Sequence, residues 1–154
     1  FAQRTEWNHD TSLDWHLLQY PPHQGIQTLV GDLNRMYRSH PALFSLDTSE
    51  AGFAWVDAND HHHSVLIFWR RSSTGSPPLL CVINFTPMDH KTFRIGVPDG
   101  GWYAELLNTD AVIYGGSGHG NLGGVQAEQI PHHGQPWSIS VALPSLASLV
   151  FSAP

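Results

Sequence analysis

The chain has 154 residues, of which 41% are hydrophobic and only 13% are charged, enough for one medium-sized domain or a smaller domain with an appendage. Thirteen acidic residues against seven basic ones give a formal net charge of -6 without any basic run, so neither nucleic acid nor an anionic membrane surface is an expected partner. No apolar run approaches the roughly 20 residues of a membrane span, and the single cysteine, Cys81, excludes a disulfide within the chain.

Residues 1–22 form the first predicted unit, an irregular segment, because Pro21 and Pro22 oppose a helix that would cross them. The segment contains the sequence EWNHDTSLDW at residues 6–15, where two tryptophans stand among acidic and amide side chains. Leu13 is its only aliphatic residue, so this stretch is poor material for a hydrophobic core. A start at FAQRTEW, without methionine, favours the interior of a longer protein, and we expect the chain to be a fragment.

The two tryptophans of this stretch, Trp7 and Trp15, allow two interpretations. They are either buried anchors beneath a long loop or flat surfaces on which sugar rings stack, and composition alone does not separate these roles. In the second case Asp10 and Asp14 would bond the hydroxyl groups of a neutral sugar. The same two acids could form a carboxylate pair for glycoside chemistry, but proximity in sequence is weak support for that, and a solvated or loop-ordering role is favoured.

A helix is predicted at residues 25–39. Its apolar residues follow the i, i+3, i+4, i+7 spacing of one helical face, and His40-Pro41 ends it because the residue before a proline avoids helical backbone angles. The helix has only one apolar face and no helical partner, so we expect another part of a longer protein to cover it. The apolar positions are Ile26, Leu29, Val30, Leu33, Met36 and Tyr37.

After a linker at residues 41–52, short runs rich in β-branched and aromatic residues alternate with turn clusters, a pattern typical of an antiparallel sandwich or barrel. In residues 137–143 apolar and small side chains alternate, which predicts a strand with one buried face. The sequence PDGG at residues 98–101 predicts a hairpin. The predicted strands are FAWVD, SVLIFWRR, LLCVINFT, TFRIGV, WYAELLNT, WSISVAL and ASLVFS.

Three further groups of residues contain side chains that can carry chemistry. Residues 115–124 are rich in glycine, but neither GK[ST] nor a helix follows, which favours a mobile surface loop over a phosphate site. The histidines at residues 61–63 point to alternate faces of an extended chain and are interpreted as solvated turn residues, as are His132 and His133; a zinc site assembled across loops stays open, but no spacing supports it. Cys81 lies in an apolar run and is interpreted as a core thiol. No metal and no cofactor are predicted.

Several motifs, in order and along the whole chain, resemble those of the glycogen branching enzymes (1,4-α-glucan branching enzymes). EWNHDTSLDW is similar to the loop after their eighth barrel strand, and GIQTLVGDLNRMYRSHPAL is similar to their last barrel helix. The family usually has Trp-Arg where this chain has Arg4-Thr5, which concerns the opening contacts of the loop. The motifs that resemble their C-terminal β-domain are GFAWVDAND, SVLIFWRR, CVINFTP, RIGVPDGGWYAELLNTDAVIYGGSGHGN and SLVF.

This resemblance implies a mainly β fold. Residues 46–154 would form an antiparallel β-sandwich of the amylase C-terminal type, and residues 1–45 would be the last loop and helix of a truncated (β/α)8 barrel. It also implies a cytoplasmic enzyme of glycogen synthesis that transfers segments of an α-glucan with retention, through two carboxyl groups roughly 5 Å apart. Those carboxylates come from earlier barrel strands, so no catalytic residue is assigned and the fragment is expected to be inactive.

The same resemblance places residues 6–15 on the active-site face of the barrel, since such sites lie at the carboxyl ends of the strands. The residues expected to bind glucan are therefore Trp7, Asp10, Asp14 and Trp15. Two alternatives stay open: a free-standing carbohydrate-binding β-sandwich, against which the helix at residues 25–39 argues, and a structural β-domain without a ligand.

Overall fold

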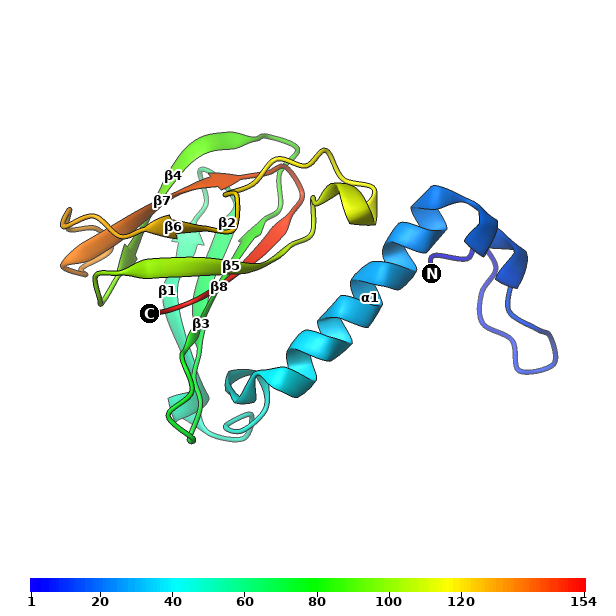
Figure 1. The fold of residues 1–154 in the computed structure, drawn as a ribbon, viewed down its shortest axis with the longest axis horizontal. Coiled ribbons are helices and arrows are strands. Elements are labelled where there is room, and N and C mark those ends of the chain that lie inside the picture. Colours follow the sequence, from blue (N-terminus) through cyan, green and yellow to red (C-terminus); the bar gives the residue numbers. More distant parts are fainter.

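The computed structural model describes all residues from Phe1 to Pro154 and shows one long helix beside two antiparallel sheets (Figure 1). The helical elements are η1 (Trp15–Gln19), α1 (Pro21–Ser39), η2 (Pro41–Leu43), η3 (Glu50–Gly52) and η4 (Val112–Tyr114), of which all but α1 are 3-10 turns. The strands are β1 (Phe53–Asp60), β2 (Val65–Arg70), β3 (Leu79–Asn84), β4 (His90–Val97), β5 (Trp102–Asn108), β6 (Gly124–Gln126), β7 (Trp137–Leu143) and β8 (Ser148–Ser152). None of the helices combines the length and the apolar character that crossing a membrane requires.

The strands form a six-stranded sheet in the order β1-β2-β3-β8-β5-β6 and a two-stranded sheet of β4 and β7. Every pairing is antiparallel, and the main hydrophobic core lies between the two sheets. The predicted antiparallel β-sandwich is therefore confirmed. Alternation explains the core, because successive side chains of a strand point to opposite faces of its sheet. The buried inward residues include Val65, Ile67 and Trp69 of β2, and Ile139, Val141 and Leu143 of β7.

The outer face of the six-stranded sheet carries a second, smaller core, to which α1 contributes. Leu29 and Met36 of α1 pack against this cluster. Gly25 approaches η4 so closely that a Cβ atom there would lie 2.4 Å from the carbonyl oxygen of Tyr114. The hydroxyl of Tyr114 in turn donates a hydrogen bond of 2.7 Å to the carboxylate of Asp32. The buried members of the cluster are Ala42, Leu79, Cys81, Leu107 and Val150.

The helix presents two different faces. One face contacts the β-domain through positions i, i+4, i+7 and i+11, which are residues 25, 29, 32 and 36. The other face is turned about 100° around the helix axis from the first and is exposed; it consists of Val30, Leu33 and Tyr37. The predicted apolar face is thus only partly covered, and its exposed part is called the α1 stripe below.

The predicted start of the helix is wrong by four residues. The helix begins at Pro21, and the two prolines occupy its first positions, where the amides have no partner within the helix in any case. The segment before it is not wholly irregular either, since η1 lies at Trp15–Gln19. The predicted end at Ser39, before His40-Pro41, is confirmed.

The hairpin predicted at residues 98–101 is also wrong. Strand β4 pairs with β7, whereas β5 pairs with β8 and β6, so this turn joins the two sheets. Close packing gives the reason for its glycines: a Cβ atom on Gly100 would lie 3.0 Å from the indole of Trp137, and Gly101, at a φ of +127°, lies against Pro154. A turn signal records local backbone preference and does not say which strands pair.

Candidate functional site

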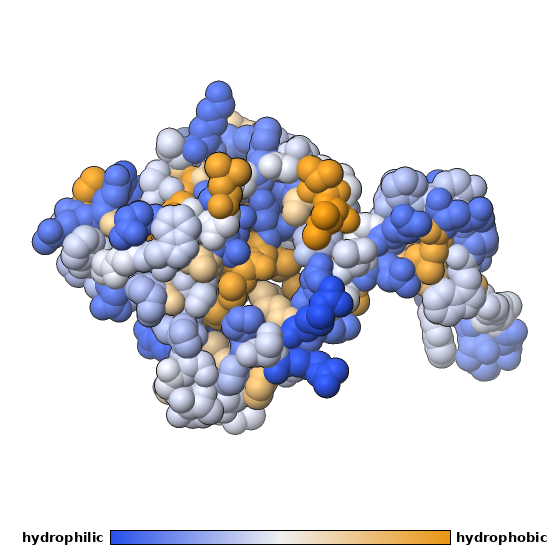
Figure 2. Space-filling model, in the orientation of Figure 1, coloured by the Kyte–Doolittle hydropathy of each residue, from blue (hydrophilic) through white to orange (hydrophobic).

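The N-terminal segment that holds the predicted site residues lies at the end of α1 that is remote from the sheets (Figure 1). Its loop is closed by short-range hydrogen bonds: the Thr5 hydroxyl donates to Asp14 over 2.9 Å, and the amide of Asp10 donates to the side chain of Asn8 over 3.0 Å. His23 of α1 lies 2.8 Å from the carbonyl oxygen of Phe1, which ties the segment to the helix. Figure 2 shows that this projecting part has a largely hydrophilic surface, which fits its lack of core residues.

The two tryptophans of the segment are solvent-exposed. Trp7 is 72% exposed and Trp15 is 56% exposed. Their ring neighbours are His9, whose centroid lies 6.2 Å from that of Trp7, and Phe1, whose centroid lies 5.4 Å from that of Trp15. Within this chain neither tryptophan is a buried anchor, so the indoles are accessible to a ligand.

The two aspartates of the segment have different surroundings. Asp10 is exposed and pairs with His9 at 3.2 Å. Asp14 closes the loop through Thr5 and lines a cleft of about 590 Å³. The two carboxylates thus bond different partners, His9 and Thr5.

Residues that the sequence interpretation missed complete this cleft. Beside Asp14 it is lined by Arg4, His16, Leu17, Tyr20, Pro21, Pro22 and His23. The sequence YPPH carried a signal for it, since prolines at the start of a helix hold the preceding residue in a fixed extended conformation. The cleft combines aromatic and proline surfaces with charged hydrogen-bonding groups, which are the features of a site for a small polar ligand.

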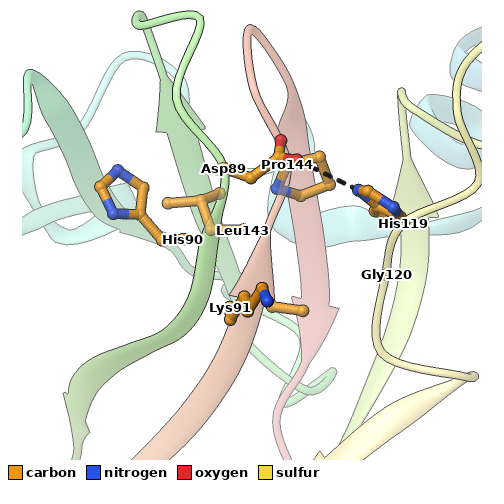
Figure 3. Close-up of a pocket in the computed structure, with 8 residues that line it drawn as sticks. Asp89, His90, Lys91, His119, Gly120, Leu143 and Pro144 are labelled. Atoms are coloured by element: carbon orange, nitrogen blue, oxygen red, sulfur yellow. Dashed lines mark ion pairs between the residues drawn. The ribbon is translucent and has the colours of Figure 1, made fainter.

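A second cleft, of about 240 Å³, lies between β4, the end of β7 and the glycine-rich segment (Figure 3). His119 and Asp89 pair across it at 3.2 Å, and Lys91 lies below them. The Asp89 carboxylate also accepts a hydrogen bond from the amide of Ser145 over 2.8 Å, which, as the largest cause, lowers the pKa of Asp89. The Asp89 carboxylate therefore stabilises the turn after β7 through its bond to Ser145.

The glycine-rich residues 115–124 are anchored to the β-domain by hydrogen bonds at both ends. Asp110 accepts hydrogen bonds from the amides of Ser117 over 2.9 Å and His119 over 3.2 Å. The amide side chain of Asn121 pairs with both the amide and the carbonyl of Ala142 in β7, at 2.7 and 3.1 Å. The segment then enters β6, a strand that the sequence interpretation did not include.

The histidines of the turns are only in part solvated. His63 pairs with Asp60 at 2.7 Å, and its ring lies 5.3 Å from that of His90. His133 is half-buried and its Nδ1 accepts a hydrogen bond from the amide of Gly96 over 3.3 Å, so the interpretation of His133 as a solvated turn residue is wrong. No group of three or more potential ligands in the chain has the geometry to hold a metal ion.

Acid should destabilise the fold through His133. Burial, and then the neighbouring His132, lower the pKa of His133, although Asp57 opposes this. Between the folded pKa and about 6.5 the unfolded chain binds more protons, so the free energy of unfolding should fall as pH drops from about 6.5 through the folded pKa. Urea unfolding between pH 7.5 and 5 measures this slope.

The variant His133→Asn should flatten that slope, because asparagine does not titrate and tolerates the positive φ of 46° at this position. His9→Asn, in the exposed N-terminal loop, is the matched control and should keep the slope. An unchanged slope in His133→Asn would contradict the assignment.

Cys81 is confirmed as a core thiol. It is buried on β3, and burial raises its pKa to about 11. A thiol with that pKa is protonated at neutral pH and is a poor nucleophile.

Comparison with known proteins gives a consistent result. The chain is 54% identical over 149 residues to the 1,4-alpha-glucan branching enzyme GlgB of Cereibacter sphaeroides, which covers 97% of this chain and 20% of that protein. It is 52% identical over 147 residues to the GlgB enzyme of Aquifex aeolicus, covering 96% of this chain and 23% of that protein. The chain thus spans about a fifth of the length of these relatives. Residues 55–154 match the family described as the alpha amylase C-terminal all-beta domain, and since their two packed antiparallel sheets fit that description, the chain belongs to this family.

Proposed function

We propose that this chain is the C-terminal part of a 1,4-α-glucan branching enzyme, which transfers glucan segments to form α-1,6 branches in glycogen. The observation that carries the proposal is the 54% identity over 97% of the chain. The family match begins at residue 55, whereas the match to the relatives covers nearly the whole chain. The relatives therefore also match the loop and the helix that precede the β-domain. A free-standing carbohydrate-binding module would not need those residues.

In this proposal residues 46–154 are the all-β domain, and residues 1–45 are the last loop and helix of a (β/α)8 barrel. The two-sided character of α1 supports this division. One face of α1 packs against the β-domain through Leu29 and Met36, while the α1 stripe is exposed. The stripe would pack on the barrel, which makes α1 the joint between the two domains.

The catalytic carboxylates of such an enzyme belong to barrel strands that are not among residues 1–154. This chain alone should therefore have no branching activity. It would contribute a face of the substrate site, with α-glucan as the ligand and the cytoplasm as the site of action.

A chimeric enzyme tests the function. The matched residues of the Cereibacter sphaeroides enzyme are replaced by this chain, and the product is incubated with amylose while the absorbance of the iodine complex is followed. Loss of the long-chain absorbance is expected for the chimera and not for the isolated chain. A folded chimera without activity, or activity of the isolated chain, would refute the proposal.

Within that enzyme we propose Trp7, Asp10, Asp14 and Trp15 as contacts to the glucan. The exposed indoles offer flat apolar faces to glucose rings, and the carboxylates accept hydrogen bonds from sugar hydroxyls. The support is the accessibility of these side chains together with the cleft beside Asp14.

Trp15→Ala in the chimera should lower kcat/KM for long glucan about tenfold, because a stacking surface is lost. The midpoint of thermal unfolding should stay nearly unchanged, since Trp15 contributes to neither hydrophobic core. Trp15→Phe is the matched variant and should recover most of the activity. A large drop in the unfolding midpoint with normal glucan kinetics would instead make Trp15 an anchor between loop and barrel.

A further inference from the structure

Trp102 of β5 lies on the outer face of the six-stranded sheet, at the end far from the helix contacts. Tyr103 of β5 points into the main core, so Trp102 and Ala104 on either side of it point outward. Trp102 is 50% exposed, whereas the outward residue Leu107 at the other end of β5 is buried in the core that α1 joins. This half of the sheet face is therefore open.

The side chains beside Trp102 on the sheet are small. Ala104 pairs with Gly124 of β6 on one side and with Ser152 of β8 on the other, so three small residues form a row across three adjacent strands (Figure 1). Trp102 itself pairs with Gln126 of β6. Among these paired residues the indole is the one large apolar group.

The indole lies with its face on Gly124. A Cβ atom on Gly124 would be 2.7 Å from both Cε2 and Cζ2 of Trp102. Cε2 is a ring-fusion carbon without a hydrogen atom, and it cannot be approached from the ring edge, so the glycine lies beneath the ring plane. One face of the indole therefore lies against the backbone of β6, while half of the residue is exposed to solvent.

Two polar groups next to this face have no partner within the chain. The indole Nε1–H of Trp102 makes no intramolecular hydrogen bond, and neither does the side-chain amide of Gln126; both residues pair only through the backbone. The hydroxyl of Ser152 donates to the carbonyl of Ala153 over 3.2 Å and keeps its acceptor sites. Donors and acceptors therefore border a flat apolar surface.

We propose that Trp102, with Gln126 beside it, is a binding site for α-glucan that is separate from the N-terminal segment. A glucose ring stacks on the free face of the indole while its hydroxyls bond the Gln126 amide and the indole Nε1–H. A protein partner is disfavoured, since a stable protein interface needs about 800 Å² per partner and this surface offers one large side chain. The inference rests on the proposed function for the nature of the ligand.

Binding at this site is measured by NMR on the 154-residue chain. The chain has six tryptophans, so the indole N–H resonance of Trp102 is identified by its absence in Trp102→Phe. On addition of maltoheptaose, the Trp102 indole resonance and the Gln126 backbone amide should shift and saturate together. They should do so equally in a chain that carries Trp7→Ala and Trp15→Ala, because the two sites are independent.

Substitutions give the affinity test, with the Gln126 backbone amide as the reporter. Trp102→Ala should weaken binding at this site about tenfold, and Trp102→Phe, which keeps a ring on Gly124, should lie between the two. Leu122→Ala, on the exposed loop before β6, is the matched control and should bind as the unaltered chain does.

If maltoheptaose does not change the chemical shift of the Trp102 indole N–H in the folded chain, the proposed site is refuted, whether or not other tryptophans respond. Equal affinity in Trp102→Ala also overturns it. Neither result touches the proposed function, which stands or falls with the activity of the chimera.

Discussion

Replacing Asn84 by alanine should lower the free energy of unfolding by about 3–4 kcal/mol. Asn84 is a buried polar residue at the end of β3, and its side-chain amide donates to the carbonyl oxygens of Met88 over 2.8 Å and Pro144 over 2.9 Å. Its side-chain oxygen accepts from both the amide and the hydroxyl of Thr86, at 2.9 and 2.8 Å. Alanine removes all four bonds and leaves the carbonyl of the buried Pro144 without its side-chain donor, which costs more than the bond itself contributed.

Urea unfolding at neutral pH, followed by tryptophan fluorescence, measures this loss. Asn59→Ala is the matched control, because Asn59 is exposed on β1 and its side chain bonds nothing in the chain; its effect should stay within about 0.5 kcal/mol. A loss below 1 kcal/mol for Asn84→Ala would show that water replaces the missing amide and that the turn after β3 does not depend on it.

Gly25→Ala should destabilise the chain by about 2–3 kcal/mol, although alanine favours a helix more than glycine does. The added Cβ atom would lie 2.4 Å from the backbone oxygen of Tyr114, which cannot move aside as a flexible side chain does. The helix must shift, and it then loses the hydrogen bond between Tyr114 and Asp32 together with the packing of Leu29 and Met36.

Gly31→Ala in the same helix should stabilise the chain, in contrast to Gly25→Ala. A Cβ atom there meets only the end of the Arg35 side chain, at 3.6 Å, so this substitution should stabilise the chain by about 0.5–1 kcal/mol through helix propensity alone. Thermal unfolding of both variants gives the comparison. If both substitutions stabilise, α1 does not dock on η4 through Gly25.

The fold class followed from local patterns. In WSISVAL the alternation of apolar and small residues placed Ile139, Val141 and Leu143 on one buried face, and the structure confirms it. The end of the helix before His40-Pro41 and the burial of Cys81 were likewise predictable. Each depends on a residue and its immediate neighbours, through side-chain period or permitted backbone angles.

The candidate site was predictable only as a set of residue types. EWNHDTSLDW left open whether its tryptophans are buried anchors or exposed stacking surfaces, and Trp7 and Trp15 are exposed in the folded chain. Their role in glucan binding stays a prediction. The cleft beside Asp14 depends on Arg4, Tyr20 and His23, which the fold of η1 and the first turn of α1 bring next to it.

The sequence by itself therefore determined the antiparallel β-domain, the single amphipathic helix and the family of the chain. Tertiary structure decided the rest: the turn at residues 98–101 became a link between sheets, and His133 became a partner of the Gly96 amide. It also decided which face of α1 meets the β-domain and which glycine lies under Trp102. These features depend on groups far apart in the chain, and their geometry is set by the packing of two sheets and a helix, which no local period or turn preference encodes.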